Sequence, residues 1–392
     1  MKIAIFSGTI PSTSFIERLI DGVSKNHEVL LFGVQKKRVH YNSKSIFIYA
    51  TPNSKWKNLW VTFFRTLLLL IKQPKTLFAL LDEVKSEKTR YSKFAKFSRC
   101  LPILLHRPDV IHLQWAKDIL SYAFLKTRFK IPLIVSFRGA HINYTPVVEP
   151  EYATIYKDLF PHVDAFHGVS KTIIYKASQY DSIANRSTVI YSPTPAFFFD
   201  TYKTYQKPNR KTIRIVSVGR NHWKKGYQYA IDAVHQLIIK GYDVQYTLIG
   251  PVKPTEALLF KMHQLDVVDA ISFKSHLNQK QLLEELKHQD VLLLPSLGEG
   301  IANVVLEAMS MGLPVISTDC GGMAEVVKHK ETGWLIPMRD AKAIETAIID
   351  FHNKSQEKLQ SIVLQAHELV KREFDYDKNI AKFIALYNSV VK

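Results

Sequence analysis

The sequence predicts an α/β protein built from two doubly wound, Rossmann-like domains that face each other across a cleft. Short apolar segments alternate with helix-like segments in both halves of the chain, and this alternation is typical of parallel sheets with right-handed crossovers. Prolines and polar residues interrupt the alternation between residues 191 and 210, which indicates a domain boundary. The expected strands are 3–6, 28–34, 46–50, 109–113 and 131–137 in the first half, and 213–218, 244–249, 291–294 and 314–317 in the second.

The expected organisation has three parts. We expect an N-terminal domain over residues 1–195, a second domain over residues 210–375, and a C-terminal helix over residues 376–392. A chain of 392 residues is long enough for two domains with substantial cores. No internal repeat of solenoid period is found, so a repeat architecture is not expected.

The composition indicates a protein of the cytoplasm. The two cysteines, Cys100 and Cys320, are far apart and lack metal-ligand spacing, which favours a reducing compartment without structural disulfides. Because Met1 and Lys2 lead directly into an expected strand, no signal peptide is expected. No run of 18 apolar residues occurs, so no membrane-spanning helix is expected either.

The positive charge of the chain is concentrated in its first half. The formal net charge is +18, and residues 1–200 hold 28 Lys and Arg against 14 Asp and Glu, a net +14. The remaining 192 residues hold 25 against 21, a net +4. This asymmetry indicates an anionic partner for the first half.

Residues 55–99 carry much of this charge. Between residues 51 and 100, 11 basic residues stand against 3 acidic ones, and they are interleaved with Trp and Phe. Such a mixture suits an interfacial segment on an anionic membrane surface. The alternative is a pair of ordinary helices that pack an apolar face on the first sheet and leave a basic face in water. No recognised nucleic-acid motif accompanies the charge, so no nucleic acid is expected as a partner.

The second domain is expected to open with a strand that leads into a basic loop. Arg220 and Lys225 lie in this loop, before a helix expected to begin at Gly226. Two cations at the carboxyl end of a strand can neutralise a diphosphate as it binds and as a leaving group develops charge. Taken singly, such a pair would more commonly be solvated loop residues.

Residues 292–309 predict a buried strand, a glycine-bearing loop and a helix that starts near Asn303. Glu299 lies on the loop and Glu307 one turn into the helix. The amides of Ala302, Asn303 and Val304 would be free donors of a helix N-terminus, which attracts phosphate oxygens. Amides for a phosphate and carboxylates for hydroxyls suit a phosphorylated sugar. The alternative is a surface Glu on a loop and a solvated Glu on a helix.

Together these motifs resemble the retaining nucleotide-sugar glycosyltransferases of family four. The resemblance rests on Gly219-Arg220-x4-Lys225-Gly226, on Glu299-x7-Glu307 with the run after it to residue 316, and on residues 318–327 with Gly333 following. It is strong over residues 213–350. In the first half only Gly8, in the loop after the first strand, and residues 109–112 look similar to the family. The resemblance implies the GT-B fold, with a C-terminal helix that returns to the first domain.

The resemblance also implies roles for individual residues. Arg220 and Lys225 would hold the donor diphosphate, Glu299 would meet hydroxyls of the transferred sugar, and Glu307 would bind the ribose hydroxyls. The amides around Ala302, Asn303 and Val304 would lie beside the sugar, and Leu277, within Ser275-His276-Leu277, would touch the base through its backbone. Gly8 would allow close approach to the phosphates. Retention would follow a front-face route in which the leaving phosphate helps to deprotonate the acceptor hydroxyl.

The sequence departs from the family pattern at residue 138. Many relatives carry a His just after the strand near residue 137, whereas Arg138 stands here, and a guanidinium cannot act as a general base at neutral pH. Arg138 could still hold the anionic leaving group. His141 is close, but a lone His three residues further on is more commonly incidental, so the role of general base stays unassigned. Asp375 and Asp377 have the spacing of a metal-binding pair but precede the last helix, where they suit its N-terminal cap. No metal and no cofactor are therefore expected.

The sequence thus predicts a metal-independent glycosyltransferase that moves a sugar from a nucleotide-diphosphate-sugar to a glycan or lipid-linked acceptor. Cell-surface polysaccharide biosynthesis is the expected setting, in the cytoplasm or peripherally at the inner face of the cell membrane. One alternative is a GT-B sugar-nucleotide epimerase or hydrolase, which would need an acid/base group that Arg138 does not supply. The other is a non-enzymatic basic protein that binds membrane or RNA.

Overall fold

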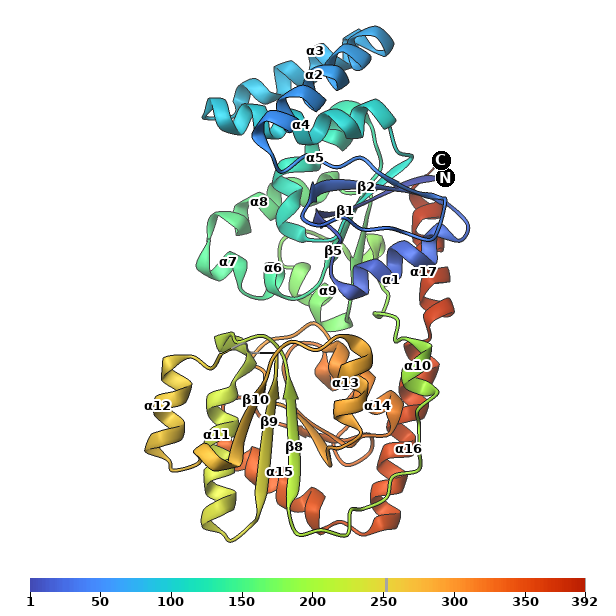
Figure 1. Cartoon of the computed structure of the whole chain (residues 1–392). Coiled ribbons are helices and arrows are strands. Elements are labelled where there is room, and N and C mark those ends of the chain that lie inside the picture. Colours follow the sequence, from blue (N-terminus) through green and yellow to red (C-terminus); the bar gives the residue numbers. More distant parts are fainter. Residues whose placement is uncertain (251–252, 392) are drawn as a thin grey trace. The chain divides into compact units, whose positions relative to one another are not determined.

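The computed structural model describes residues 1–250 and 253–391, which form two compact units (Figure 1). The first unit contains Met1–Val169, Ile173–Ile190 and the chain from Asp377 on. The second contains Ser170–Thr172 and Tyr191–Tyr376. Each unit is built around a parallel sheet with helices on its faces, and each has its own hydrophobic core.

The sheet of the first unit has the strand order β3-β2-β1-β4-β5-β6-β7, with all pairs parallel. The chain starts in the middle of this sheet, moves outward through β2 and β3, and returns to the other side of β1 for β4, so the sheet is doubly wound. The strands are β1 (Lys2–Ile10), β2 (Glu28–Gln35), β3 (Ile46–Ile48), β4 (Val110–Leu113), β5 (Leu133–Phe137), β6 (Ala165–Gly168) and β7 (Ser187–Val189).

The sheet of the second unit repeats this plan in the order β10-β9-β8-β11-β12-β13, again with all pairs parallel. Two doubly wound, Rossmann-like sheets confirm the predicted fold class. The strands are β8 (Ile213–Val218), β9 (Val244–Ile249), β10 (Ile271–Lys274), β11 (Val291–Leu294), β12 (Val315–Thr318) and β13 (Trp334–Ile336).

The helices alternate with the strands along both units. Their bounds are α1 (Ser14–Ser24), α2 (Lys55–Lys72), α3 (Pro74–Glu83), α4 (Arg90–His106), α5 (Ile119–Phe129), α6 (Ala140–Asn143), α7 (Thr145–Val148), α8 (Glu151–Leu159), α9 (Lys171–Ala177), α10 (Ala196–Phe199), α11 (Tyr227–Ile239), α12 (Glu256–Gln264), α13 (Gln279–Leu286), α14 (Asn303–Met311), α15 (Ala341–Asn353), α16 (Gln356–Glu373) and α17 (Tyr376–Val390).

The C-terminal helix α17 returns to the first unit, as the family resemblance implied. A chain of buried hydrogen bonds links it to the sheet: Tyr387 OH lies 2.9 Å from His112 Nδ1, and His112 Nε2 lies 2.7 Å from Ser136 Oγ. Ser136 Oγ is in turn 2.7 Å from Nδ1 of His167, whose Nε2 donates to the carbonyl oxygen of Ile190 at 2.8 Å. Three strands and the last helix are thus connected through side chains with almost no contact with water.

The first strand differs from the prediction in length. We expected it to end at residue 6 and Gly8 to lie in a following loop, but β1 continues to Ile10 and contains Gly8. The pairing of β1 with β2 shifts register between Phe6 and Thr9, which marks a bulge at this point. Gly8 adopts a φ of +81° there, a conformation that favours glycine.

Candidate functional site

In the second unit, the loops that follow β8 and β11 are held against each other at the carboxyl edge of the sheet. The amide of Leu297 donates to the carbonyl oxygen of Lys224 at 2.6 Å. Gly226, with φ at +65°, lies so close to this partner that a β-carbon would stand 2.0 Å from the Pro295 carbonyl oxygen. The position therefore requires glycine, and this contact fixes Lys225 next to the loop that carries Glu299.

Lys225 and Glu299 form an ion pair across these two loops. Lys225 Nζ lies 2.7 Å from Glu299 Oε1, and each side chain retains only 14% of its exposure. The hydroxyl of Ser296 donates to the same carboxylate oxygen at 3.0 Å. The structure thus brings together two of the residues to which the sequence assigned one site.

A third loop, which follows β12, makes backbone contacts with the loop that carries Glu299. Gly321 has a φ of +60°, and a β-carbon there would stand 1.9 Å from the Glu299 carbonyl oxygen. The amide of Gly322 donates to the Gly300 carbonyl oxygen at 2.7 Å. The glycine pair in the run 318–327 therefore allows two backbones to approach closely, which positions Glu299 from its backbone.

Helix α14 begins at Asn303, as expected, and its N-terminus lies directly after the loop of Glu299. The amide of Ala302 faces the sulfur of Met323 at 3.4 Å, which is a weak acceptor. The first amide of the helix to bond to backbone is that of Val305, which donates to the Ala302 carbonyl oxygen. Within the described chain, the amides of Asn303 and Val304 make no hydrogen bond, so both can donate to a ligand.

Glu307 lies one turn into α14, with 5% of its side chain exposed. Its Oε1 faces Gln279 Nε2 at 3.5 Å, on α13. Leu277 is half-buried between β10 and α13, where it packs against the core beneath α14. Glu307 and the backbone around Leu277 therefore belong to neighbouring segments of this unit.

Arg220 lies exposed on the loop after β8, and the structure adds Lys224 to the cations there. Burial, opposed by Glu299 and reinforced by Lys225 and Arg220, lowers the pKa of Lys224. His222 lies among the same three cations, and burial followed by their charges lowers its pKa. Lys224 is not among the site residues predicted from the sequence, although its place beside Lys225 in a basic loop could have indicated it.

In the first unit, Arg138 lies at the carboxyl end of β5, and its Nη2 donates to Gln114 Oε1 at 2.5 Å. Its guanidinium also lies over the ring of Phe15, 4.7 Å from the centroid. Burial lowers the pKa of Arg138 to about 9, so the group is still charged at neutral pH. Among the described residues, Arg138 Nε and the buried Gln114 Nε2 have no hydrogen-bond acceptor. Gly8 lies at the same sheet edge, and a β-carbon there would meet no atom within 4 Å.

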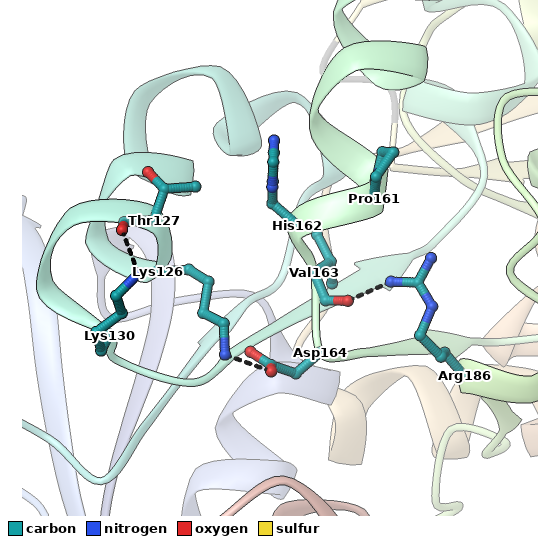
Figure 2. Close-up of a pocket in the computed structure, with 8 residues that line it drawn as sticks. All are labelled: Lys126, Thr127, Lys130, Pro161, His162, Val163, Asp164 and Arg186. Carbon is teal, nitrogen blue, oxygen red and sulfur yellow. Dashed lines mark hydrogen bonds and ion pairs between the residues drawn. The ribbon is translucent and has the colours of Figure 1, made fainter.

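A pocket elsewhere in the first unit lies at the opposite, amino edge of the sheet (Figure 2). Lys126, Lys130 and Arg186 line it, but internal contacts hold all three. Lys126 pairs with Asp164, Arg186 bonds to the Val163 carbonyl oxygen and to Asp181, and Lys130 donates to the Thr127 carbonyl oxygen at 3.0 Å. We therefore assign these cations a structural role.

Two further observations concern metals and membranes. No group of three or more His, Cys, Asp or Glu side chains suited to a metal ion occurs in the described part of the chain. Asp377 lies in the first turn of α17, where a negative charge favours the helix. None of the helices in the same residues combines the length and the apolar character that crossing a bilayer requires.

Comparison with known proteins identifies relatives of part of the chain. Residues 199–368 match the family described as "Glycosyl transferases group 1". Over 172 residues the chain is 36% identical to "Putative colanic acid biosynthesis glycosyltransferase WcaL" of Escherichia coli K12, which covers 42% of each protein. Over 169 residues it is 32% identical to "Amylovoran biosynthesis glycosyltransferase AmsK" of Erwinia amylovora, which covers 42% of this chain and 41% of that protein. The matched segments thus span less than half of these relatives.

Solved structures resemble the whole chain. A structure of Anabaena Alr3699/HepE in complex with UDP has a TM-score of 0.70 at 17% identity, over 98% of this chain and all of the other. A sucrose-phosphate synthase from Thermosynechococcus elongatus has a TM-score of 0.74 at 17% identity, over 99% of this chain and 98% of the other. At such identities the likeness concerns the fold.

Proposed function

We propose that this chain, which belongs to the glycosyl transferases group 1 family through residues 199–368 and has the GT-B fold, is a retaining glycosyltransferase. It would move a sugar from a nucleotide-diphosphate-sugar to a glycan or lipid-linked acceptor. The observation that carries the proposal is the Lys225–Glu299 ion pair beside two free amides at the N-terminus of α14. This arrangement offers a cation and amides to a diphosphate, and a carboxylate to the hydroxyls of a sugar.

The cations would act on the donor phosphates. Arg220, Lys224 and Lys225 lie on one loop, and three positive charges can offset a diphosphate and the charge that develops on it as it leaves. We therefore propose that transfer needs no metal ion. Lys225 would then exchange its bond to Glu299 for a phosphate oxygen, which frees the carboxylate for the transferred sugar.

The carboxylates and backbone amides would bind the ribose, the transferred sugar and the base of the donor. Glu307, buried on α14 next to Gln279, would accept hydrogen bonds from the two ribose hydroxyls. Glu299 would accept from sugar hydroxyls, the amides of Asn303 and Val304 would donate beside it, and the backbone at Leu277 would contact the base. Ala302 would contribute as the N-cap of α14, because its amide already faces Met323.

The first unit would supply the acceptor side and one more cation. Arg138 stays charged at neutral pH, so it would bind the leaving phosphate and would not remove a proton. The acceptor oxygen would attack the anomeric carbon on the face from which the phosphate departs, and the acceptor proton would pass to a phosphate oxygen. Gly8 would leave room for the phosphates at the same sheet edge.

The relatives suggest where to look for the substrates. The matched relatives carry names of colanic acid and amylovoran biosynthesis, and Alr3699/HepE has been solved with UDP and with UDP-glucose. We therefore propose a role in cell-surface polysaccharide biosynthesis, with a UDP-sugar as donor, in the cytoplasm or at the inner face of the membrane.

A panel of nucleotide-sugars, tested for thermal stabilisation, identifies the donor because a bound ligand raises stability by mass action. Titration calorimetry with the free nucleotide diphosphate and with the intact donor then tests the two carboxylates. Glu307→Gln should weaken the binding of both ligands, and Glu299→Gln should weaken the binding of the intact donor only. Equal effects of the two variants on the free nucleotide would contradict the assignment. Release of free sugar without an acceptor would instead indicate a hydrolase.

A further inference from the structure

Helix α2 turns its polar side inward and its apolar side outward. Among its described residues only Thr62 and Leu69 are buried. Leu69 joins the core of the first unit, but the other inward contacts of the helix are polar. Asn58 Nδ2 donates to Ser98 Oγ at 3.5 Å, and Arg65 Nη1 donates to the Ala50 carbonyl oxygen at 3.2 Å. The alternative of two ordinary helices that pack an apolar face inward holds in part, since Leu77 and Leu80 of α3 are buried in the core. It does not account for the large apolar side of α2 that faces outward.

The outer sides of α2 and of the adjoining α3 expose many large apolar side chains, and we call this surface the outer face. Trp60 lies 6.3 Å from Phe64 and 6.5 Å from Phe63, measured between ring centroids, so the aromatic rings form one cluster. In Figure 1 both helices lie outside α4 in the first unit. The exposed large apolar residues of the outer face are Trp56, Leu59, Trp60, Phe63, Phe64, Leu67, Leu68, Leu70, Ile71, Phe78 and Leu81.

Lysines lie at both ends of α2, next to the outer face. Lys55 and Lys57 lie in its first turn, Lys72 in its last, and Lys75 at the start of α3. Two lysines at a helix N-terminus oppose the helix dipole, so the stability of the helix does not explain them. In the described part of the chain these four lysines form no ion pair, and no Asp or Glu occurs between residues 55 and 81.

We propose that the outer face binds a membrane surface rich in anionic lipids. Its aromatic and aliphatic side chains would enter the interfacial layer, while the four lysines contact lipid headgroups. A second copy of the chain fits less well, because symmetric pairing would bring the lysines of both copies together without any acidic partner. Since α2 is also unable to cross a bilayer, it would lie in the plane of the membrane surface.

Co-sedimentation of the full chain with vesicles tests this proposal without any turnover, so its result is independent of the donor chemistry. The vesicles contain either phosphatidylglycerol with phosphatidylcholine or phosphatidylcholine alone, across a salt series. We expect strong binding to the anionic vesicles at low salt. Part of this binding should survive at about 0.5 M salt, where charge is screened within a few Å.

Two variants separate insertion from charge. The triple variant Trp60→Ser, Phe63→Ser, Phe64→Ser should lower the apparent affinity by at least about tenfold and abolish the salt-resistant part. Its matched control changes exposed apolar residues elsewhere, Val147→Ser, Ile239→Ser and Phe260→Ser, and should bind like the wild type. Changing Lys55, Lys57, Lys72 and Lys75 to Gln should remove the preference for anionic vesicles. Changing Lys211, Lys358, Lys371 and Lys382 to Gln is the control of equal charge.

Tryptophan fluorescence of the wild-type protein gives a second measurement of membrane binding, which needs no substitution in the protein. Vesicles should shift tryptophan emission to shorter wavelength, and quenchers placed in the bilayer should reduce it, with most of the effect lost in Trp56→Phe, Trp60→Phe. The proposal is overturned if the wild type ignores anionic vesicles at low salt. It is equally overturned if sedimentation in solution shows a dimer that the triple outer-face variant dissociates.

Discussion

At the scale of single residues, the Lys225–Glu299 pair is the feature on which the proposed chemistry depends most. Both side chains are largely removed from water and hold each other at 2.7 Å. Taking two charges out of water is costly, and their attraction repays that cost only with good geometry and additional hydrogen bonds. The bond from Ser296 supplies one such addition. A ligand that offers a phosphate to Lys225 and hydroxyls to Glu299 would satisfy both groups.

Lys225→Ala tests this pair in catalysis. We expect a loss of roughly 2–4 kcal/mol in transition-state stabilisation, on the scale of one lost electrostatic donor, while the protein remains folded. The measurement is kcat/KM with the donor found by the panel, together with a melting temperature. Lys211→Ala, an exposed lysine before β8, is the matched control. A folded Lys225→Ala protein with wild-type turnover would rule out the role of Lys225.

At the scale of elements, the site depends on how closely three loops approach at one sheet edge. Backbone contacts set the distances: Gly226 against Pro295, and Gly321 against Glu299. Glycine permits both the left-handed conformation and the approach, so these positions control where Lys225 and Glu299 stand. The elements therefore act as a scaffold, and the loops between them carry the polar groups.

Gly226→Ala and Gly241→Ala separate these two requirements. Both positions have positive φ, but a β-carbon at Gly241 meets nothing within 4 Å, whereas one at Gly226 would stand 2.0 Å from a carbonyl oxygen. Gly241→Ala should cost about 1 kcal/mol of unfolding free energy. Gly226→Ala should cost roughly 3 kcal/mol or more and also weaken donor binding. Urea unfolding measures both variants, and equal costs would show that the Pro295 contact relaxes freely.

At the scale of the whole molecule, acid should act on the first unit through two buried histidines. The first unit is held to α17 by His112 and His167, and burial lowers the pKa of both, that of His167 to about 3. The hydrogen bond to Ile190 requires a proton on His167 Nε2, which leaves Nδ1 to accept from Ser136. Both histidines are therefore neutral in the folded protein, whereas in the unfolded chain they bind protons below about pH 6.5.

Acidification should therefore destabilise the first unit. Because the unfolded state binds more protons, this stability is fully present above about pH 6.5 and is lost as the pH falls toward 3. The slope should approach about 1.4 kcal/mol per pH unit for each histidine. Urea unfolding at a series of pH values measures the slope. Amide exchange in peptides of β6 shows that the unfolding concerns the first unit. His167→Gln should reduce the slope by one proton. An unchanged slope in His167→Gln would contradict this account.

The sequence by itself determined the fold class and the segments of the candidate site. Long apolar strands were predicted closely, and β8, β9 and β11 have the predicted bounds, because apolar periodicity is a local property. The strands β6, β7 and β10 were missed because polar residues or glycine interrupt their short apolar runs, and β13 because it has only three residues. Only the tertiary structure decided that Lys225 reaches Glu299, that Lys224 joins them, that Gly8 lies inside β1, and that α2 turns its apolar side outward. Each of these depends on which residues, far apart in the chain, are brought into contact, and packing sets those contacts.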